Sequence, residues 1–266
     1  MLTNTEVWYR VTTKQIESLE AADERIIREN FSLHSKISRV FLYLEFGIVP
    51  IRFLIKVRRL LYLKWVLQEP EDSLVYRFLQ IMIKKPLVGD WINLVKQDLK
   101  DFEVNLTFDE IKRISKQEFK DKIKQKMSEK AFEYLILIKE KQSKLKDIVY
   151  NKFETQHYLL PESGFSKTEM SNAMWARSRT IPVKANFRTA HPNMECRACG
   201  TTEESQPHLL RCAALNENSV ASNINDNYDD LFSDNKTKLQ EISNRLSVQN
   251  RKLQALISAP FDPPQG

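Results

Sequence analysis

The sequence contains little glycine. Its five glycines among 266 residues make up about 2% of the chain, against roughly 7% in an average protein. They never form the patterns G-x-G-x-x-G or G-x-x-x-x-G-K-[ST], so the glycine-rich loops that cradle nucleotide phosphates are excluded. Low glycine with abundant Lys, Glu, Leu and Ile favours helices. No strand pattern or internal repeat is evident.

Long apolar runs are also missing. No uncharged apolar run approaches the ~18 residues that a membrane span needs, and residues 1–10 lack the basic-then-apolar pattern of a signal peptide. We therefore expect an intracellular protein, in the nucleus or the cytoplasm, with no membrane partner. The only three cysteines lie within 17 residues of one another, and a reducing compartment does not favour disulfides.

Charge is distributed unevenly along the chain. The net charge is +6, but residues 111–150 carry 12 basic and 6 acidic residues and residues 151–190 carry 6 and 3. Residues 191–235, in contrast, carry 2 basic and 8 acidic residues. A basic block attracts polyanions, chiefly nucleic acid or anionic membrane. The alternative is a solvated Lys/Glu helix face, and charge alone does not separate the two interpretations.

Apolar periodicity and end signals predict an all-α fold. Thr12 with Gln15, Thr107 with Glu110 and Ser115 with Glu118 have the spacing of capping boxes, and Gly47 is placed to end a helix. We read residues 151–170 as a turn or linker. The predicted helices run from Thr12 onward and over Ser38–Phe46, residues 51–69, Ser73–Ile83, Trp91–Asp101, Lys116–Lys146 and 235–256.

The longest predicted helix is basic and amphipathic. Its inner stripe is Phe119, Ile123, Met127, Ala131, Tyr134/Leu135 and Ile138. Its expected outer face carries lysines, at positions Lys120, Lys122, Lys124, Lys126, Lys130, Lys139, Lys141, Lys144 and Lys146.

Two further groups of cations are candidate nucleic-acid contacts. Arg52, Lys56 and Arg59 share one helix face at i, i+4 and i+7. Residues 174–188 form a short basic arm without an acidic residue, whose candidates are Arg177, Arg179, Lys184 and Arg188. Either group could meet phosphates or only water.

The strongest chemical signal is the pattern Cys196-x2-Cys199-x8-His208-x3-Cys212. Zinc prefers four tetrahedral nitrogen and sulfur ligands, and Cys-x2-Cys offers two sulfurs from one tight turn. Pro207 can open a helix that places His208 and Cys212 on one face. Three thiolates and one imidazole leave no coordination position for water, so we expect one structural Zn²⁺ and no catalytic metal.

Other interpretations of this cluster remain open. The cysteines could be small buried apolar side chains, or a redox pair, although no βαβ context surrounds them. His191 could replace a ligand or lie in a loop. If the metal binds, it supplies folding free energy of roughly 10–16 kcal/mol to a segment too short to bury a core.

The order of these features resembles the C-terminal region of non-LTR (LINE-type) retrotransposon reverse transcriptases. The resemblance rests on residues 174–188, MWARSRTIPVKANFR, followed by the cluster CRACGTTEESQPHLLRC and then YDDLF and KLQEIS. Upstream, it extends to VWYRVTTKQIESLEAADERIIREN, which is similar to the segment where these enzymes place the thumb, and to LYLEFGIVPIRFLIKVRRLLYL.

The resemblance implies a non-catalytic part of a larger enzyme. Polymerisation needs carboxylates that hold two metals, and Tyr228-Asp229-Asp230 does not fit the family's aromatic-x-Asp-Asp turn because Asn227 stands where the aromatic is required. We therefore predict no catalytic residues. By the same resemblance, the endonuclease and the polymerase palm lie upstream of Met1 and are possible partners of this chain.

The expected organisation has six parts. These are thumb-like helices (1–70), a helical region ending in the long basic helix (71–150), a linker and basic arm (151–190), a CCHC zinc knuckle (191–215), an acidic loop (216–235), and a C-terminal helix and tail (236–266).

The predicted function is zinc-dependent binding of RNA or DNA. The resemblance implies template–primer or target-DNA binding during target-primed reverse transcription, although the knuckle is itself acidic and could instead staple the basic arm. The alternative is a helical structural or interaction protein stapled by zinc, whose C-terminal helix pairs with a partner helix.

Overall fold

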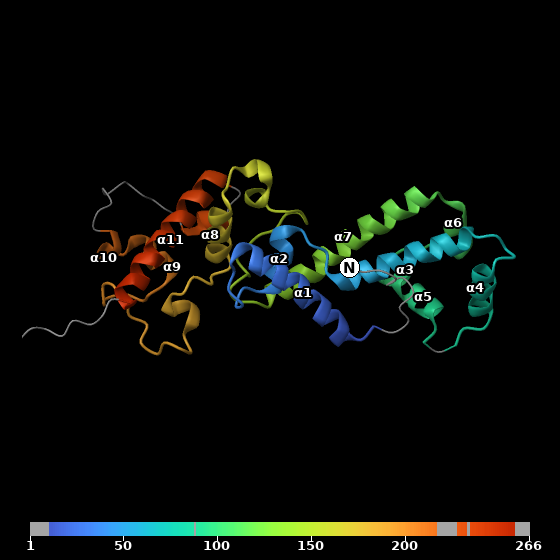
Figure 1. Ribbon diagram of the computed structural model, residues 1–266, viewed down its shortest axis with the longest axis horizontal. Coiled ribbons are helices and arrows are strands. Elements are labelled where there is room, and N and C mark those ends of the chain that lie inside the picture. The colour runs from blue at the N-terminus through green and yellow to red at the C-terminus, as the bar shows by residue number, and fades with distance from the viewer. Residues whose placement is uncertain (1–10, 88, 217–227, 233–234, 259–266) are drawn as a thin grey trace, which may run out of the picture. The chain divides into compact units, whose positions relative to one another are not determined.

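Helices make up all the regular secondary structure in the part of the chain that the structure describes. The computed structural model describes residues 11–87, 89–216, 228–232 and 235–258 (Figure 1). Within these ranges all regular elements are helices, and pairing between extended segments is limited to two isolated β-bridges. The predicted all-α fold is confirmed. None of the described helices combines the length and apolarity that crossing a membrane requires.

The α-helices have the following bounds: α1 Thr13–Phe31, α2 Arg39–Phe46, α3 Ile51–Gln68, α4 Leu74–Lys84, α5 Trp91–Asp101, α6 Phe108–Arg113, α7 Lys116–Glu140, α8 Lys167–Arg177, α9 Gln206–Arg211, α10 Ala213–Asn216 and α11 Lys236–Ser258. Short 3-10 helices lie at η2 His157–Leu159, η3 Pro161–Ser163, η4 Lys184–Phe187 and η5 Tyr228–Phe232. The predicted acidic loop and tail fall largely on residues 217–227, 233–234 and 259–266, outside the described ranges.

Three of the four predicted helix-end signals act as expected, and Ser115 forms half of its capping box, its hydroxyl accepting from the amide of Glu118. Thr12 and Gln15 exchange hydrogen bonds at the start of α1, and Thr107 and Glu110 form a full capping box at α6. Gly47 takes φ = 61° after α2, a conformation that favours glycine. The capping box of Ser166 and Glu169 begins α8, a helix that the sequence analysis assigned partly to a linker.

The chain divides into two compact units, which are described separately. Unit 1 comprises Met1–Arg25 and Gly47–Ile138, and unit 2 comprises Ile26–Phe46 and Lys139–Gly266.

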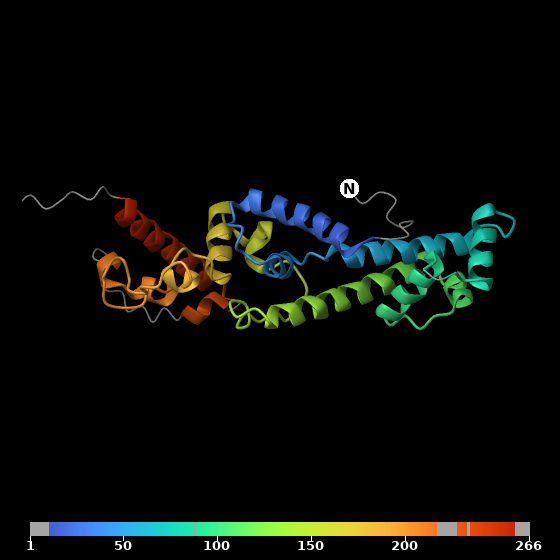
Figure 2. The ribbon, with the colours of Figure 1, turned by 90° about the horizontal axis from the view of Figure 1, so that it is seen from below.

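Helix α3 is the centre of unit 1. It packs against α4, α5 and α6 and buries ten of its residues. The ring of Phe53 in α3 lies 5.7 Å from that of Tyr134 in α7, and Figure 2 shows these two helices running alongside one another. The ammonium of Lys64, 1% exposed, donates to the carbonyl oxygens of Ile111 and Ile114. This cation satisfies the carbonyl groups left open at the end of α6.

The long basic helix is shorter than predicted. Helix α7 ends at Glu140, not near Lys146. Lys139, expected on the outer face, is buried, and its ammonium donates to the carbonyl oxygens of Lys146 and Ile148. The chain turns back over this side chain and buries Leu145 and Ile148. The end of the helix therefore depends on a tertiary contact that periodicity does not reveal.

Unit 2 is organised around a buried carboxylate. Glu45 of α2 is fully buried and accepts hydrogen bonds from the hydroxyls of Tyr150 and Tyr158. The guanidinium of Arg177 lies 3.1 Å from the same carboxylate and donates to the carbonyl oxygen of Leu231. Burial, then the neighbouring Glu45 charge, raises the pKa of both tyrosines, which therefore remain donors. This network connects α2, α8 and η5 within the unit.

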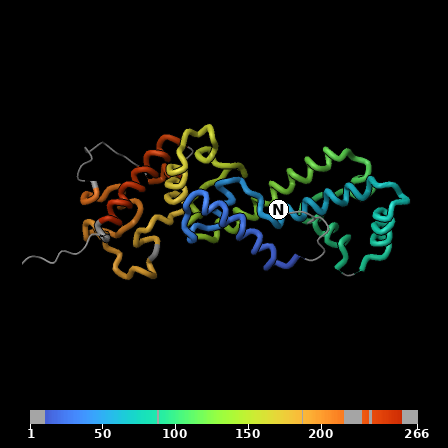
Figure 3. Tube along the Cα trace, viewed as in Figure 1, coloured from blue at the N-terminus to red at the C-terminus, as the bar shows by residue number. Residues whose placement is uncertain are grey.

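Helix α11 closes unit 2. It packs against α8, α9, α10 and η5, and the trace in Figure 3 follows the chain from α8 to α11. Leu239, Ile242, Leu246 and Leu253 form its buried stripe. The apolar stripe that could have paired with a partner helix is therefore used inside the unit.

The Glu45 network predicts a strong effect of Arg177→Met. Removing one partner of a buried ion pair leaves an uncompensated charge, so we expect a loss of about 3–5 kcal/mol in the free energy of unfolding. Arg188→Ala is the control, because its ion pair with Glu203 is exposed and should contribute little. Urea unfolding followed by circular dichroism, with hydrogen exchange to assign the transition to unit 2, measures both. Equal stability of the two variants would contradict this role of Arg177.

Candidate metal centre

Four potential metal ligands converge in unit 2. Single ligand atoms from Cys196, Cys199, His208 and Cys212 all lie within 4.8 Å of one another. The Sγ atoms of Cys196 and Cys212 are 4.0 Å apart, and Sγ of Cys199 is 3.4 Å from Nε2 of His208. These are the four residues predicted from their spacing, and their arrangement can hold a metal ion.

A tight turn presents the first two sulfurs. The amide of Gly200 donates to the carbonyl oxygen of Cys196 at 2.8 Å, and Gly200 takes φ = 66°. The amide of Cys196 donates to the carbonyl oxygen of Thr202, so the turn is closed on both sides. A residue with a Cβ would be strained at this positive φ, which explains the glycine.

A short helix supplies the other two ligands. Helix α9 begins after Ser205, whose hydroxyl accepts from the amide of His208, and Pro207 lies in its first turn. His208 lies inside the helix and Cys212 directly follows its last residue, Arg211. The prediction that one helix carries both ligands on one face holds only in part, because His208 lies in the helix whereas Cys212 caps its end with extended backbone.

The thiols differ in their surroundings. Hydrogen bonds from Thr201, chiefly from its hydroxyl, lower the pKa of Cys199 to about 6. Burial, with the nearby Cys196, raises the pKa of Cys212 to about 11. Three closely spaced thiols cannot all ionise without a compensating cation, which is what a metal ion would provide.

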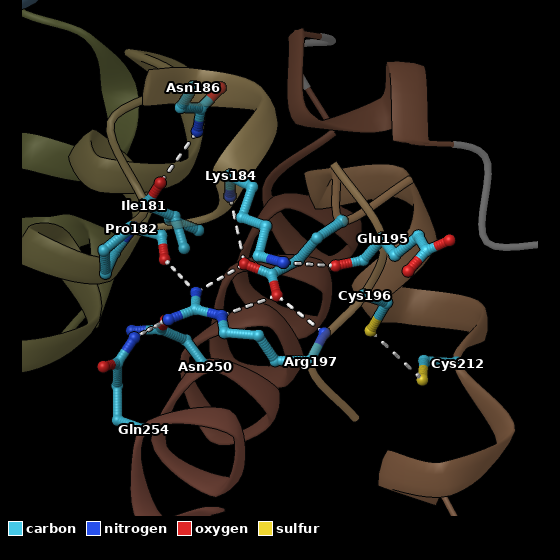
Figure 4. Close-up of polar contacts among 11 residues, drawn as sticks. Ile181, Pro182, Lys184, Asn186, Glu195, Cys196, Arg197, Cys212, Asn250 and Gln254 are labelled. Atoms are coloured by element: carbon cyan, nitrogen blue, oxygen red, sulfur yellow. Dashed lines mark hydrogen bonds and ion pairs between the residues drawn. The ribbon is translucent and has the colours of Figure 1, made fainter. Parts of the chain in front are cut away.

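Glu204 joins the metal-ligand loop to the basic arm. Its side chain is fully buried and accepts from the amides of Lys184 and Arg197, each at 3.0 Å, and from the guanidinium of Arg197. That guanidinium also reaches the carbonyl oxygen of Pro182. Figure 4 shows these contacts beside Cys196 and Cys212. Burial raises the pKa of Glu204, but the hydrogen bonds outweigh it and hold the pKa below its usual value.

The candidate cations of the basic arm lie in different environments. The ammonium of Lys184 donates a hydrogen bond to the carbonyl oxygen of Glu195, and Arg188 pairs with Glu203 at 2.7 Å. Arg179 pairs with Asp147 at 2.8 Å and remains partly exposed. Arg177 is only 3% exposed and bound to Glu45. A buried guanidinium held by a carboxylate cannot reach a phosphate, so its position argues against the predicted contact.

The three cations of the predicted basic stripe on α3 are paired with acidic side chains. Arg52 pairs with Glu20, and Lys56 pairs with Asp101. Arg59, 7% exposed, pairs with the buried Asp98 at 2.8 Å. The three residues share a face as predicted, but acidic residues of α1 and α5 cover it. Arg59 in particular is a core residue and not a surface cation.

The Tyr228-Asp229-Asp230 segment makes structural contacts within unit 2. The Tyr228 hydroxyl lies 3.1 Å from Nε2 of Gln206, Leu231 is fully buried, and Asp230 pairs with Lys238 of α11. The segment forms η5, with no strand pair beside it among the described residues.

Comparisons with protein-family models, with curated proteins and with solved structures find no match to this chain. Fold and site together define its class: an all-α protein with a Cys3His cluster that can hold a metal ion.

The role of Glu204 generates a prediction. Glu204→Gln leaves all four potential ligands in place, so we expect an unchanged capacity to bind a metal ion while the amides of Lys184 and Arg197 exchange their hydrogens about tenfold faster. The reason is that a neutral amide is a weaker acceptor than a carboxylate. Hydrogen exchange followed by NMR tests this.

Glu203→Gln is the matched control, since Glu203 is the neighbouring, exposed glutamate. Unchanged protection of both amides in Glu204→Gln would show that this carboxylate does not hold the arm.

Proposed function

We propose that the Cys3His cluster binds one structural Zn²⁺ and that the chain is a zinc-dependent RNA- or DNA-binding module. In this proposal it is the non-catalytic C-terminal part of a non-LTR retrotransposon reverse transcriptase. The convergence of Cys196, Cys199, His208 and Cys212 carries the proposal.

The distances within the cluster favour zinc. A tetrahedral ion with Zn–S bonds of about 2.3 Å and a Zn–N bond of about 2.0–2.1 Å separates two sulfurs by about 3.8 Å, and sulfur from nitrogen by about 3.5 Å. The separations of Cys196–Cys212 (4.0 Å) and Cys199–His208 (3.4 Å) lie near these values, and all four ligand atoms lie within 4.8 Å of one another. Thiolate and imidazole are also ligands that suit zinc. Four protein ligands close the coordination shell, which supports a structural role.

Three lysines on one face of α7 support binding to a polyanion, and of these Lys116 and Lys124 are exposed and Lys120 is partly exposed. Lys116, Lys120 and Lys124 recur at i, i+4 and i+8, and no ion pair of theirs occurs among the described residues. Successive members lie about 6 Å apart along the axis, which suits contacts to a charged backbone. In unit 2, Arg188 is the most exposed cation of the arm, with 69% of its side chain accessible. Contacts of this kind give affinity without sequence specificity.

The alternative is a helical interaction protein stapled by zinc. The apolar stripe of α11 is not available to a partner helix, because it is buried within unit 2. The alternative therefore requires another surface. The two functions differ in their response to salt, because phosphate contacts release counterions and apolar contacts do not.

The zinc content of purified protein tests the metal. We expect one zinc per chain, lost in Cys199→Ala because three ligands bind far more weakly than four. Thr201→Ala is the control, since it alters the neighbouring hydroxyl and keeps the ligands. Absence of zinc from wild-type protein never exposed to a chelator would contradict the metal site.

Salt dependence tests nucleic-acid binding. Affinity for duplex DNA should fall steeply with salt, by about 0.9 log units per log unit for each neutralised phosphate. Changing Lys116, Lys120 and Lys124 together to Gln should reduce this slope by up to about 3. Fluorescence anisotropy of labelled DNA and RNA measures it.

Lys126→Gln with Lys130→Gln is the matched control on the same helix, because Glu129, Glu103 and Glu133 already pair with these lysines. A flat salt response of the wild-type protein would favour the alternative function.

A further inference from the structure

Helix α4 in unit 1 turns an apolar stripe towards solvent. Leu74, Phe78 and Ile81 recur at i, i+4 and i+7, and they are 69%, 55% and 59% exposed. Leu79 is the one buried residue of the helix. A surface helix ordinarily places its apolar stripe against the core, and α4 does the opposite.

Two further apolar side chains near this stripe in the sequence are also exposed. Val75 and Leu87 are 37% and 69% exposed. Leu87 follows the helix, and its amide donates to Asp90 while its carbonyl oxygen accepts from Asn93. We call Leu74, Val75, Phe78, Ile81 and Leu87 the α4 surface. Its exposed apolar area is on the order of 500 Å², within the range of patches that are often functional.

Opposite charges lie at the two ends of the α4 surface. Glu71 and Asp72 precede the helix, Lys84 ends it and Lys85 follows, and all four are exposed. Glu71 makes a single long contact of 3.4 Å with Lys112. For the other three, no ion pair occurs within the described residues. The surface is thus acidic at one end and basic at the other, and its central apolar stripe is flanked by the exposed Arg77.

We propose that the α4 surface is a dimer interface, on which α4 packs antiparallel against α4 of a second copy of the chain. If the two-fold axis passes near Phe78, residues equally distant from it face each other. Glu71 and Lys85 each lie seven residues from Phe78, and Asp72 and Lys84 each lie six. Both ends of the pair then join opposite charges, whereas a parallel pair would join like charges.

The size and symmetry of the surface suit this partner. Such an interface is isologous and closes with two copies. Interfaces of standard size bury about 800 Å² per partner around an apolar centre, so the α4 surface provides the centre and the charged ends provide the rim. Antiparallel helices also place opposite ends of their dipoles together. The proposal does not depend on the metal site or on nucleic acid.

Sedimentation velocity of the full chain over a range of concentrations tests the proposal. We expect a dimer that Phe78→Glu converts to a monomer, because the substitution buries a charge beside its symmetry mate. The control is Val149→Glu, at an exposed apolar residue (67%) in unit 2, which should remain dimeric. A wild-type monomer at the highest attainable concentration, or a dimer that survives Phe78→Glu, would overturn the proposal.

A charge-exchange experiment tests the antiparallel arrangement. One variant carries Glu71→Lys and Asp72→Lys, and the other carries Lys84→Glu and Lys85→Glu. Each alone should be monomeric, since like charges meet at both ends. An equimolar mixture should dimerise again, because each end of the mixed dimer pairs opposite charges. Failure of the mixture to dimerise, with both variants folded by circular dichroism, would overturn the arrangement.

Discussion

Three thiol groups and an imidazole share one small volume in unit 2, and the surrounding structure depends on that convergence. Their ligand atoms lie within 4.8 Å of one another, although the segment that carries them buries few large apolar side chains. Much of its interior is polar, including Glu204 and Gln206. Ionised thiols at this separation repel each other, so a bound cation both removes the repulsion and fixes the turn and the helix.

The consequences extend beyond the four ligands. Gln206 lies in the same helix as His208, and its side chain donates to the carbonyl oxygen of Ala176 in α8 and accepts from Asn186 in η4. Arg245 of α11 donates to the carbonyl oxygen of Leu210. Once α9 is fixed, these contacts position α8, η4 and α11 around it. With the proposed metal bound, the cluster would support unit 2 locally, and the contacts of Glu204 would extend that support to the basic arm.

Features encoded by neighbouring residues could be predicted from the sequence. Gly47 predicts where α2 ends, and Pro50 predicts where α3 begins. The spacing of the cysteines and the histidine predicts the potential metal ligands. Features that depend on distant partners could not. Arg59 and Arg177 resemble surface cations until Asp98, 39 residues away, and Glu45, 132 residues away, are placed beside them. Helix α8 was missed although its signal, Ser166 with Glu169, was present.

Zinc K-edge X-ray absorption of the purified chain tests the central claim most directly, because it reports the atoms that surround the ion. The expected first shell contains three sulfurs at about 2.3 Å and one nitrogen at about 2.0–2.1 Å, with no water. A shell with fewer sulfurs, or with an oxygen from solvent, would contradict a closed Cys3His site.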